Sequence, residues 1–551
     1  MHTATHARAR STKQVLAEAA TVTTSLSPYN GTFGRQQAYH LLRRSTFGVT
    51  LERVAEAEGL GLNATLDRLL TDDDFDGLPI NVEGRGDPNV PVGETWITSP
   101  YVQGFDVNPY RQRSLQAWQM RSYYRGGFSA QAKMSLFWNN HFAVFRDNAD
   151  ARLYYYYLDT LRRNALGNFS ELVRAITVNP AMLRFLNGNQ NLATSPNENY
   201  ARELLELFTL GKGDLAGPGD YTTYTEDDVR AIARALTGWT ARGINSTNAD
   251  IPYPEPIFIA SRHDTGTKQL SARFGGQTIA NAGDREYSNV IDIVFAHPLS
   301  ADYLCRKLYR WFVYYDITPE VEADIIQPLA ATLRNSDFEV VPVLRQLLGS
   351  EHFFAMRQRG GMIASPIDFS IAALASLEFA VPDDMRLEHA FMLTLTGACA
   401  NQQMVPSQPP SVAGWKAYYQ APLYSRSWIN AATLKARSNF TDAITTEGLM
   451  LNNRVSFQHE LLDLLRGFDN PSDPNDVVAE FVERLLPEPL TQEQLDTLKS
   501  VLVPGLPDFE WTVEYNQHLA SPNDAGLRES LERKLRLLAK TVFTAAEAHL
   551  S

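Results

Sequence analysis

The stretch LERVAEAEGLGLNATLDRLL, residues 51–70, carries the pattern that decides the fold class. Its apolar residues recur at intervals of three and four, which is the period of a helix that buries one face. The same periodicity returns over about 34–47, 111–125, 129–145, 152–165, 169–186, 197–210, 225–238, 285–296, 300–314, 318–334, 338–349, 366–379, 385–397, 428–446 and 456–549. We therefore predict an all-α protein, a predominantly helical multi-helix array.

Residues 250–280 interrupt the helical pattern. Two short segments, the apolar 257–260 and 268–271, flank the polar turn 262–266, and this arrangement predicts a small β-hairpin insertion. Residues 72–109, rich in Asp, Pro and Gly, predict a long surface loop. For the domains, we predict a flexible lead-in over 1–33 and a single large helical domain over 34–551, with a C-terminal helical subdomain from about 450 as an alternative.

The composition predicts a globular protein, and the net charge disfavours nucleic acid as a partner. The 551 residues are 44% hydrophobic, 11% aromatic and 21% charged, which is enough apolar material for a sizeable core. The formal net charge is −13. A broad negative field repels phosphate backbones, so we expect no nucleic-acid partner. The oligomeric state is left open.

Targeting and redox signals are weak. Cys305 and Cys399 form no Cys-x-x-Cys pair, and Cys305 reads as a small buried hydrophobe. No stretch approaches the roughly 18 apolar residues of a membrane span, so no span is expected. The apolar run from Val15 to Ala20 is broken by Glu18, which argues against a secretory signal in this sequence.

Several short motifs occur in a fixed order along the helices. They are HLLRRSTFG (40–48), FWNNHF (137–142), NPAML (179–183), PNENYAREL (196–204) with Glu206, YTEDDV (224–229), ALTGW (235–239), His263-Asp264, PPSVAGW (409–415) and WIN (428–430). In this order they resemble the bacterial family catalogued as domain of unknown function 1800. The resemblance spans roughly residues 35–545.

The resemblance implies little about chemistry, because the family carries no settled activity. It does imply export, to the periplasm or the outside, as the usual destination. Two positions depart from the family pattern. Asn139 stands where the family's Trp-His-Asn-His-Phe form has its first histidine, and Phe208 stands where its Glu-Leu-His-Thr-Leu-Gly form has one. If those histidines bind metal in relatives, this chain lacks them.

The predicted helix over 197–210 has one polar face. At 100° per residue, its polar side chains fall within an arc of about 140°; they are Glu198, Asn199, Arg202, Glu203, Glu206 and Thr209. One interpretation is a solvated face with Glu198–Arg202 and Arg202–Glu206 ion pairs. The other is the wall of a cleft.

In the cleft interpretation, Glu203 and Glu206 are catalytic carboxyls one turn apart. Their like charges would raise the pKa of one carboxyl, or the pair would hold a divalent cation. Arg202 would clamp an anionic substrate group, with Glu198 and Asn199 as further substrate-binding residues.

His263-Asp264 is the second catalytic candidate. A histidine oriented by a carboxylate serves as a general base or a metal ligand, and Lys268 would add a positive charge for substrate binding. The alternative is a turn in which Asp264 bonds to the neighbouring backbone and His263 is exposed.

Three further residues have a structural and a functional interpretation. His141 is either a satisfied core histidine or a metal ligand together with Glu206. Trp415 and Trp428 either lock helix packing or form aromatic platforms for a sugar ring.

The leading hypothesis is a hydrolase-type enzyme that uses carboxylates or a divalent metal ion on a polar, carbohydrate-like or anionic small-molecule or glycan substrate. The alternative is a non-catalytic protein that binds a glycan or a protein partner. A helical enzyme with an organic cofactor is the third hypothesis. Nucleotide-dependent and serine-hydrolase functions are disfavoured, because no Gly-x-Gly-x-x-Gly, Walker loop, His-Glu-x-x-His or Gly-x-Ser-x-Gly motif occurs.

Overall fold

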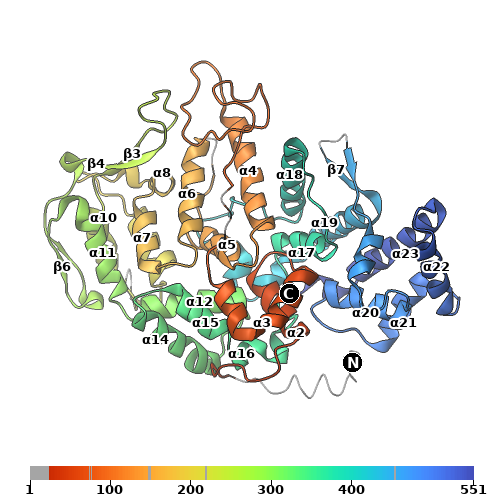
Figure 1. Ribbon diagram of the computed structural model, residues 1–551. Coiled ribbons are helices and arrows are strands. Elements are labelled where there is room, and N and C mark those ends of the chain that lie inside the picture. Colours follow the sequence, from red (N-terminus) through yellow and green to blue (C-terminus); the bar gives the residue numbers. More distant parts are fainter. Residues whose placement is uncertain (1–23, 74, 76, 147–149, 218–219, 452–454) are drawn as a thin grey trace. The chain divides into compact units, whose positions relative to one another are not determined.

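The computed structural model of the protein describes residues 24–73, 75, 77–146, 150–217, 220–451 and 455–551 (Figure 1). Its contacts divide the chain into two compact units. The middle unit, as we call it, consists of Leu66–Leu348 and Val405–Tyr424. The terminal unit consists of residues up to Thr65, Gly349–Met404 and Ser425–Ser551. The single domain over 34–551 stays a prediction beside this division.

The middle unit is built mainly from helices. They are α4 (Asn108–Tyr124), α5 (Gln131–His141), α6 (Ala151–Arg163), α7 (Phe169–Thr177), α8 (Pro180–Phe185), α9 (Asn199–Glu203), the π-helix η2 (Leu204–Thr209), α10 (Glu226–Ala235), α11 (Glu286–Phe295), α12 (Leu299–Phe312), α13 (Pro319–Val321), the π-helix η6 (Glu322–Ile326), α14 (Gln327–Asn335) and α15 (Val340–Leu348). Short 3-10 turns are η1 (Gly188–Gln190), η3 (Ala260–Arg262), η4 (Ala272–Phe274), η5 (Gly283–Arg285) and η8 (Lys416–Tyr418).

The terminal unit is also helical. It contains α2 (Arg35–Ser45), α16 (Glu351–Phe354), α17 (Pro366–Ser376), α18 (Met385–Asn401), α19 (Ala431–Asp442), the π-helix η10 (Ala443–Glu447), α20 (Pro474–Leu485), α21 (Gln492–Leu502), α22 (Phe509–Ala520) and α23 (Ala525–Phe543), with the 3-10 turns η7 (Met356–Gln358), η11 (Leu461–Gly467) and η12 (Ala546–His549). Helix α3 (Leu51–Leu69) and the turn η9 (Tyr424–Trp428) each include residues of both units.

The strands form only two-stranded antiparallel sheets. The pairs are β1 (Leu215–Gly217) with β2 (Asp220–Tyr221), β3 (Trp239–Arg242) with β4 (Glu255–Phe258), β5 (Lys268–Gln269) with β6 (Thr278–Ile279), and β7 (Leu449–Leu451) with β8 (Val455–Phe457). The all-α class with a small hairpin insertion is therefore confirmed. The strand partners differ from the prediction, in which 257–260 and 268–271 pair with each other. Instead, β4 pairs with the earlier strand β3, and β5 pairs with the later strand β6.

Local chemistry explains where helices begin and break. Thr225 and Asp228 form a reciprocal capping box at the start of α10, as the sequence suggests. The predicted helix over 169–186 is two helices, because Asn179 caps a new helix that begins at Pro180. Helix α3 is interrupted at Gly61, whose φ of 74° suits glycine.

The beginning of the chain is fastened within the terminal unit. Residues 1–23 of the predicted flexible lead-in lie outside the described residues. Beyond them, the backbone of Ser25, Ser27 and Tyr29 forms hydrogen bonds with the segment 349–352. Among the described residues, no helix combines the length and the apolar character that crossing a membrane requires.

Two buried ion pairs fasten the loop before α4 in the middle unit. Arg111 pairs with Asp87 and Arg152 pairs with Asp150, each at 2.6 Å, and all four side chains are at most 1% exposed. The ring of Tyr101 lies between the two guanidinium groups, 4.9 and 4.6 Å from their central carbons. Buried ion pairs thus hold the predicted surface loop in place. A buried charge is strongly destabilising unless it is paired, and here each arginine has its carboxylate.

The Arg152 guanidinium also joins the loop to the β3–β4 hairpin. It donates hydrogen bonds to the carbonyl oxygens of Ser99, Gly243 and Pro252. Ser99 belongs to the loop, while Gly243 and Pro252 lie between the two strands. One side chain therefore positions two segments that have little regular structure of their own.

We expect Arg152→Met to lower the free energy of unfolding by about 3–5 kcal/mol, because it leaves the Asp150 carboxylate buried without its cation. The matched control is Arg113→Met. Arg113 forms a 3.7 Å pair with Glu83 in which both side chains are more than half exposed, so its loss should cost less than about 1 kcal/mol. Urea denaturation measures both, and equal losses would contradict the role given to the buried pair.

Candidate functional site

The helix that begins after Asn197 changes type in its middle. The Asn197 side chain accepts a hydrogen bond from the Asn199 backbone N–H, 3.0 Å, and so starts α9. From Leu204 the chain continues as the π-helix η2, and the Leu210 N–H bonds to the Leu205 carbonyl at 3.1 Å. The uniform arc predicted for residues 197–210 is therefore wrong beyond Glu203.

The wider turn changes which side chains are buried. Thr209, expected on the polar face, is fully buried and donates to the Leu204 carbonyl. Leu207, an apolar residue, is only partly buried. Asn199, expected to bind substrate, is exposed at the first turn of α9. π-Helical turns are rare and occur often at functional sites.

Arg202 is engaged by two carboxylates. Its guanidinium forms two parallel 2.6 Å hydrogen bonds with Glu226 of α10 and one of 3.1 Å with Glu198. The Glu226 contact raises the pKa of Arg202 further above its ordinary value. The predicted Glu198–Arg202 pair is confirmed, whereas Glu206 pairs with Lys212 instead of Arg202. Clamping a substrate anion would require Arg202 to leave Glu226.

Glu203 and Glu206 lie together on the exposed side of this helix. Glu206 accepts hydrogen bonds from the Tyr224 hydroxyl, 3.2 Å, and from Lys212, 3.5 Å. The half-buried Glu203 carboxyl forms no hydrogen bond or ion pair with any described residue. Burial, and then the neighbouring Glu206 carboxylate, raise the pKa of Glu203. The like charge of Glu206, which the sequence predicts to raise the pKa of its neighbour, is thus the second cause after burial.

Helix α12 and helix α5 satisfy the carbonyl groups at the end of η2. Tyr303 donates its hydroxyl to the Leu207 carbonyl at 2.9 Å, and Lys307 donates to the same oxygen at 3.0 Å. His141 is bonded to the Phe208 carbonyl at 2.9 Å through Nε2. Carbonyls at a helix end have no partner within the helix, so these side chains fix the turn that carries Glu206.

Gly211 permits the approach of Tyr303. Its φ is 79°, and a Cβ atom there would lie 2.9 Å from the Tyr303 ring. Burial, and then the nearby Glu206 carboxylate, raise the pKa of Tyr303. Gly211 follows the end of η2 and leaves room for the Tyr303 ring, whose hydroxyl is bonded to the Leu207 carbonyl of that helix.

Lys307 is an amine without a carboxylate partner in the described part of the chain. Its Nζ bonds to the Leu207 carbonyl and, at 3.1 Å, to Nδ1 of His141. Burial, and then the positive charge of Arg310, lower the pKa of Lys307 to about 7. The helix end favours a cation at this place, and desolvation opposes it.

His141 behaves as a satisfied core histidine. A carbonyl only accepts, so Nε2 carries the proton and Nδ1 accepts from Lys307. Burial and then Lys307 hold the pKa of His141 well below its ordinary value. Both ring nitrogens are engaged, which leaves no lone pair for the predicted metal. Within the described ranges, no group of three or more His, Cys, Asp or Glu residues could hold a metal ion.

His263, expected to be exposed or catalytic, is buried in a separate ionic cluster. Its Nε2 lies 2.9 Å from Glu286 of α11, and its Nδ1 lies 2.9 Å from the Thr237 carbonyl. Lys268 pairs with the other Glu286 oxygen, and the side chains of Lys268 and Glu286 are fully buried. Among the described residues, the side chains of His263 and Lys268 form hydrogen bonds with Thr237, Asp264 and Glu286, and none with Glu203.

Asp264 closes the turn beside this cluster. It bonds to Arg234 of α10 at 2.7 Å and accepts from the Gly266 backbone N–H at 2.8 Å. The Arg234 contact lowers the pKa of Asp264. The predicted backbone-bonded turn is confirmed, and Asp264 orients Arg234 rather than His263.

Neither tryptophan forms a surface platform. Trp415 is 3% exposed, and its backbone N–H donates to the Asn140 side chain within the middle unit. Trp428, in the terminal unit, is 6% exposed. A sugar ring needs an open aromatic face, so these rings serve packing. Cys305 is buried and free, as expected of a small hydrophobe.

Sequence reasoning located the acidic pair and missed the residues that surround it. Those are Lys212, Tyr224, Glu226, Tyr303 and Lys307. One signal was available: Tyr303 and Lys307 are four residues apart and therefore share a helix face. Which segment that face meets is set by packing between distant parts of the chain.

The comparisons with known proteins agree with the motifs. The family model described as Protein of unknown function (DUF1800) matches residues 40–515, so the chain belongs to this family. Searches of curated proteins and of solved structures found no match.

We expect Lys307 to make stability rise with pH from about 7 to 9. The unfolded lysine titrates near 10.4 and the folded one at about 7, so in this window the unfolded state binds more protons. Lys307→Met should remove roughly 1–2 kcal/mol of that rise, after allowance for solvent screening. Denaturation of both proteins at pH 7, 8 and 9 measures the difference, and parallel profiles would contradict it.

Proposed function

We propose that the middle unit is a hydrolase that uses Glu203 as general acid and Glu206 as general base on a neutral, carbohydrate-like substrate. The observation that carries the proposal is the Glu203 carboxyl, half-buried, without a hydrogen-bond partner and with a raised pKa, one turn from Glu206. A carboxyl that keeps its proton toward neutral pH can deliver it to a leaving group.

Glu206 has the surroundings of a base. Tyr224 and Lys212 contact its two oxygens, 25% of its side chain is exposed, and water therefore reaches it. In the proposed reaction, Glu206 takes a proton from water as the water oxygen attacks. Glu203 gives its proton to the oxygen that leaves. Glu206 then releases its proton to solvent and Glu203 takes up a proton from solvent, which restores both groups for the next turnover.

The local charges favour a neutral substrate over an anionic one. Arg202 is occupied by Glu226 and Glu198, and Lys212 by Glu206. Two carboxyl groups with no free cation beside them repel a phosphate or a carboxylate. A glycoside carries many hydroxyl groups and no charge, and its hydrolysis is the usual task of two neighbouring carboxyls.

We expect the protein to hydrolyse at least one member of a panel of nitrophenyl glycosides, and Glu203→Gln to lose about 100-fold or more of that rate. Glu171→Gln is the matched control and should keep the wild-type rate, because Glu171 is an exposed glutamate of the same unit that pairs with Arg174. Rates from released nitrophenol decide the matter. Glycan binding without turnover would support the non-catalytic alternative and overturn the proposal.

The pH profile gives an independent check. The acid must be protonated, so activity should fall as pH rises through the raised pKa of Glu203. In Glu203→Gln the residual rate should lose this alkaline limb. A wild-type rate that keeps rising into alkaline pH would exclude Glu203 as the acid.

A further inference from the structure

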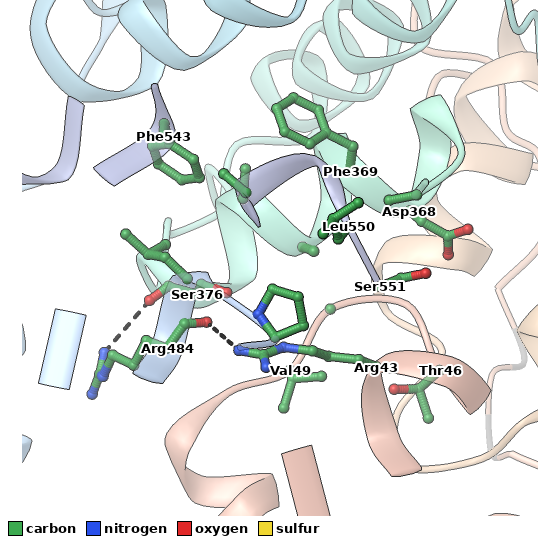
Figure 2. Close-up of a pocket in the computed structure, with 17 residues that line it drawn as sticks. Arg43, Thr46, Val49, Asp368, Phe369, Ser376, Arg484, Phe543, Leu550 and Ser551 are labelled. Atoms are coloured by element: carbon green, nitrogen blue, oxygen red, sulfur yellow. Dashed lines mark hydrogen bonds between the residues drawn. The ribbon is translucent and has the colours of Figure 1, made fainter. Parts of the chain in front are cut away.

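The terminal unit contains a small cavity of about 50 Å³ that the proposed function does not use. Its walls come from the end of α2, from α17 and from the segment after α23 (Figure 2). One water needs roughly 10–15 Å³ of such space, so the cavity holds about four waters or a ligand of four to six heavy atoms.

Most of the wall is apolar. Val49, Phe369, Phe543 and Leu550 line it, together with small residues of α17. Gly48, from the same motif as Arg43 and Thr46, lets the chain pass against α17. Its φ is 74°, and a Cβ atom there would lie 2.6 Å from Ala375. The walls therefore suit an alkyl group.

Arg43 provides the charge at one end of the cavity. Its Nη2 donates to the carbonyls of Glu483 and Arg484, at 2.7 and 2.9 Å. Within the described residues, its Nε and Nη1 have no hydrogen-bond partner, and no carboxylate lies within ion-pair distance. Burial lowers the pKa of Arg43, which records the cost of this desolvated charge. Figure 2 shows the guanidinium group beside the pocket, bonded to the Arg484 carbonyl.

The other charged groups at the cavity are engaged. Arg484 pairs with Glu378 at 3.4 Å and donates to the Ser376 carbonyl at 3.5 Å. Asp368 accepts from the Ser365 hydroxyl at 2.7 Å. In Figure 2 Asp368 and the Arg43 guanidinium lie on opposite sides of the pocket. An anion is thus accepted at the Arg43 end and repelled at the other.

Ser376 adds a hydroxyl group to the lining. The side chain is 8% exposed, and its Oγ forms no hydrogen bond with a described residue. A guanidinium with free N–H groups and a hydroxyl are the partners that a carboxylate prefers. The opposite apolar walls and Asp368 exclude a second negative charge.

We propose that this pocket binds a short-chain monocarboxylate of about four to six heavy atoms, with its carboxylate on Arg43 and its alkyl group against Val49, Phe369 and Leu550. The size follows from the cavity volume, and the charge follows from the Arg43 guanidinium, which bonds to two carbonyls and lies over the Tyr39 ring but has no carboxylate within ion-pair distance among the described residues.

Sodium propionate tests the proposal, with the full chain and with propionamide as the uncharged isostere. We expect saturable binding of propionate by calorimetry and by thermal shift, at least about tenfold tighter than that of propionamide, at constant ionic strength. No saturable binding of propionate, or equal binding of the two compounds, would overturn the proposal.

Two variants locate the site by different means. Arg43→Met removes the charge, and Ala372→Leu fills the cavity while Arg43 stays in place; each should weaken propionate binding at least about tenfold. Arg528→Met, an exposed ion-pair residue of the same unit, is the control and should bind as the wild type does. Unchanged binding in a folded Ala372→Leu protein would exclude this pocket.

Discussion

The carbonyl groups at the end of the π-helix η2 are the constraint on which the candidate site depends. Leu207 and Phe208 have no partner within the helix for these oxygens, and Tyr303, Lys307 and His141 satisfy them. Three side chains from two other helices thus hold one turn of chain. Because Glu206 stands on that turn, its position relative to Glu203 is set by contacts behind the site rather than by the acidic residues themselves.

The spacing of apolar residues predicted most of the helices, because a helix that buries one face carries apolar residues every three or four positions along the sequence. The helices near 51–70, 152–165 and 366–379 begin and end within a few residues of the predicted bounds. Errors occurred where a competing local interaction decides, as at Asn179-Pro180, where a cap and a proline start a new helix. The β7–β8 hairpin falls mostly between the predicted helical stretches 428–446 and 456–549, where no strand was predicted, because short apolar runs do not distinguish strand from helix.

The candidate site was predictable only as far as one helix turn. Spacing alone places Glu203 beside Glu206 and Glu198 beside Arg202. It does not reveal that Glu226 occupies Arg202, nor that Glu286 holds both His263 and Lys268 in the interior. These partners are many residues away in sequence, so only the packing of α10 and α11 brings them into contact.

The distribution of cations explains why Glu203 differs from its neighbours. Glu198 and Glu226 share Arg202, and Glu206 has Lys212 and Tyr224. Among the described residues, no cation forms an ion pair with the half-buried Glu203. A desolvated carboxyl without a cation lowers its energy most simply by keeping a proton. Burial and the neighbouring Glu206 carboxylate therefore raise the pKa of Glu203, while Arg202 and Lys212, the two cations that oppose the rise, are bonded to other carboxylates.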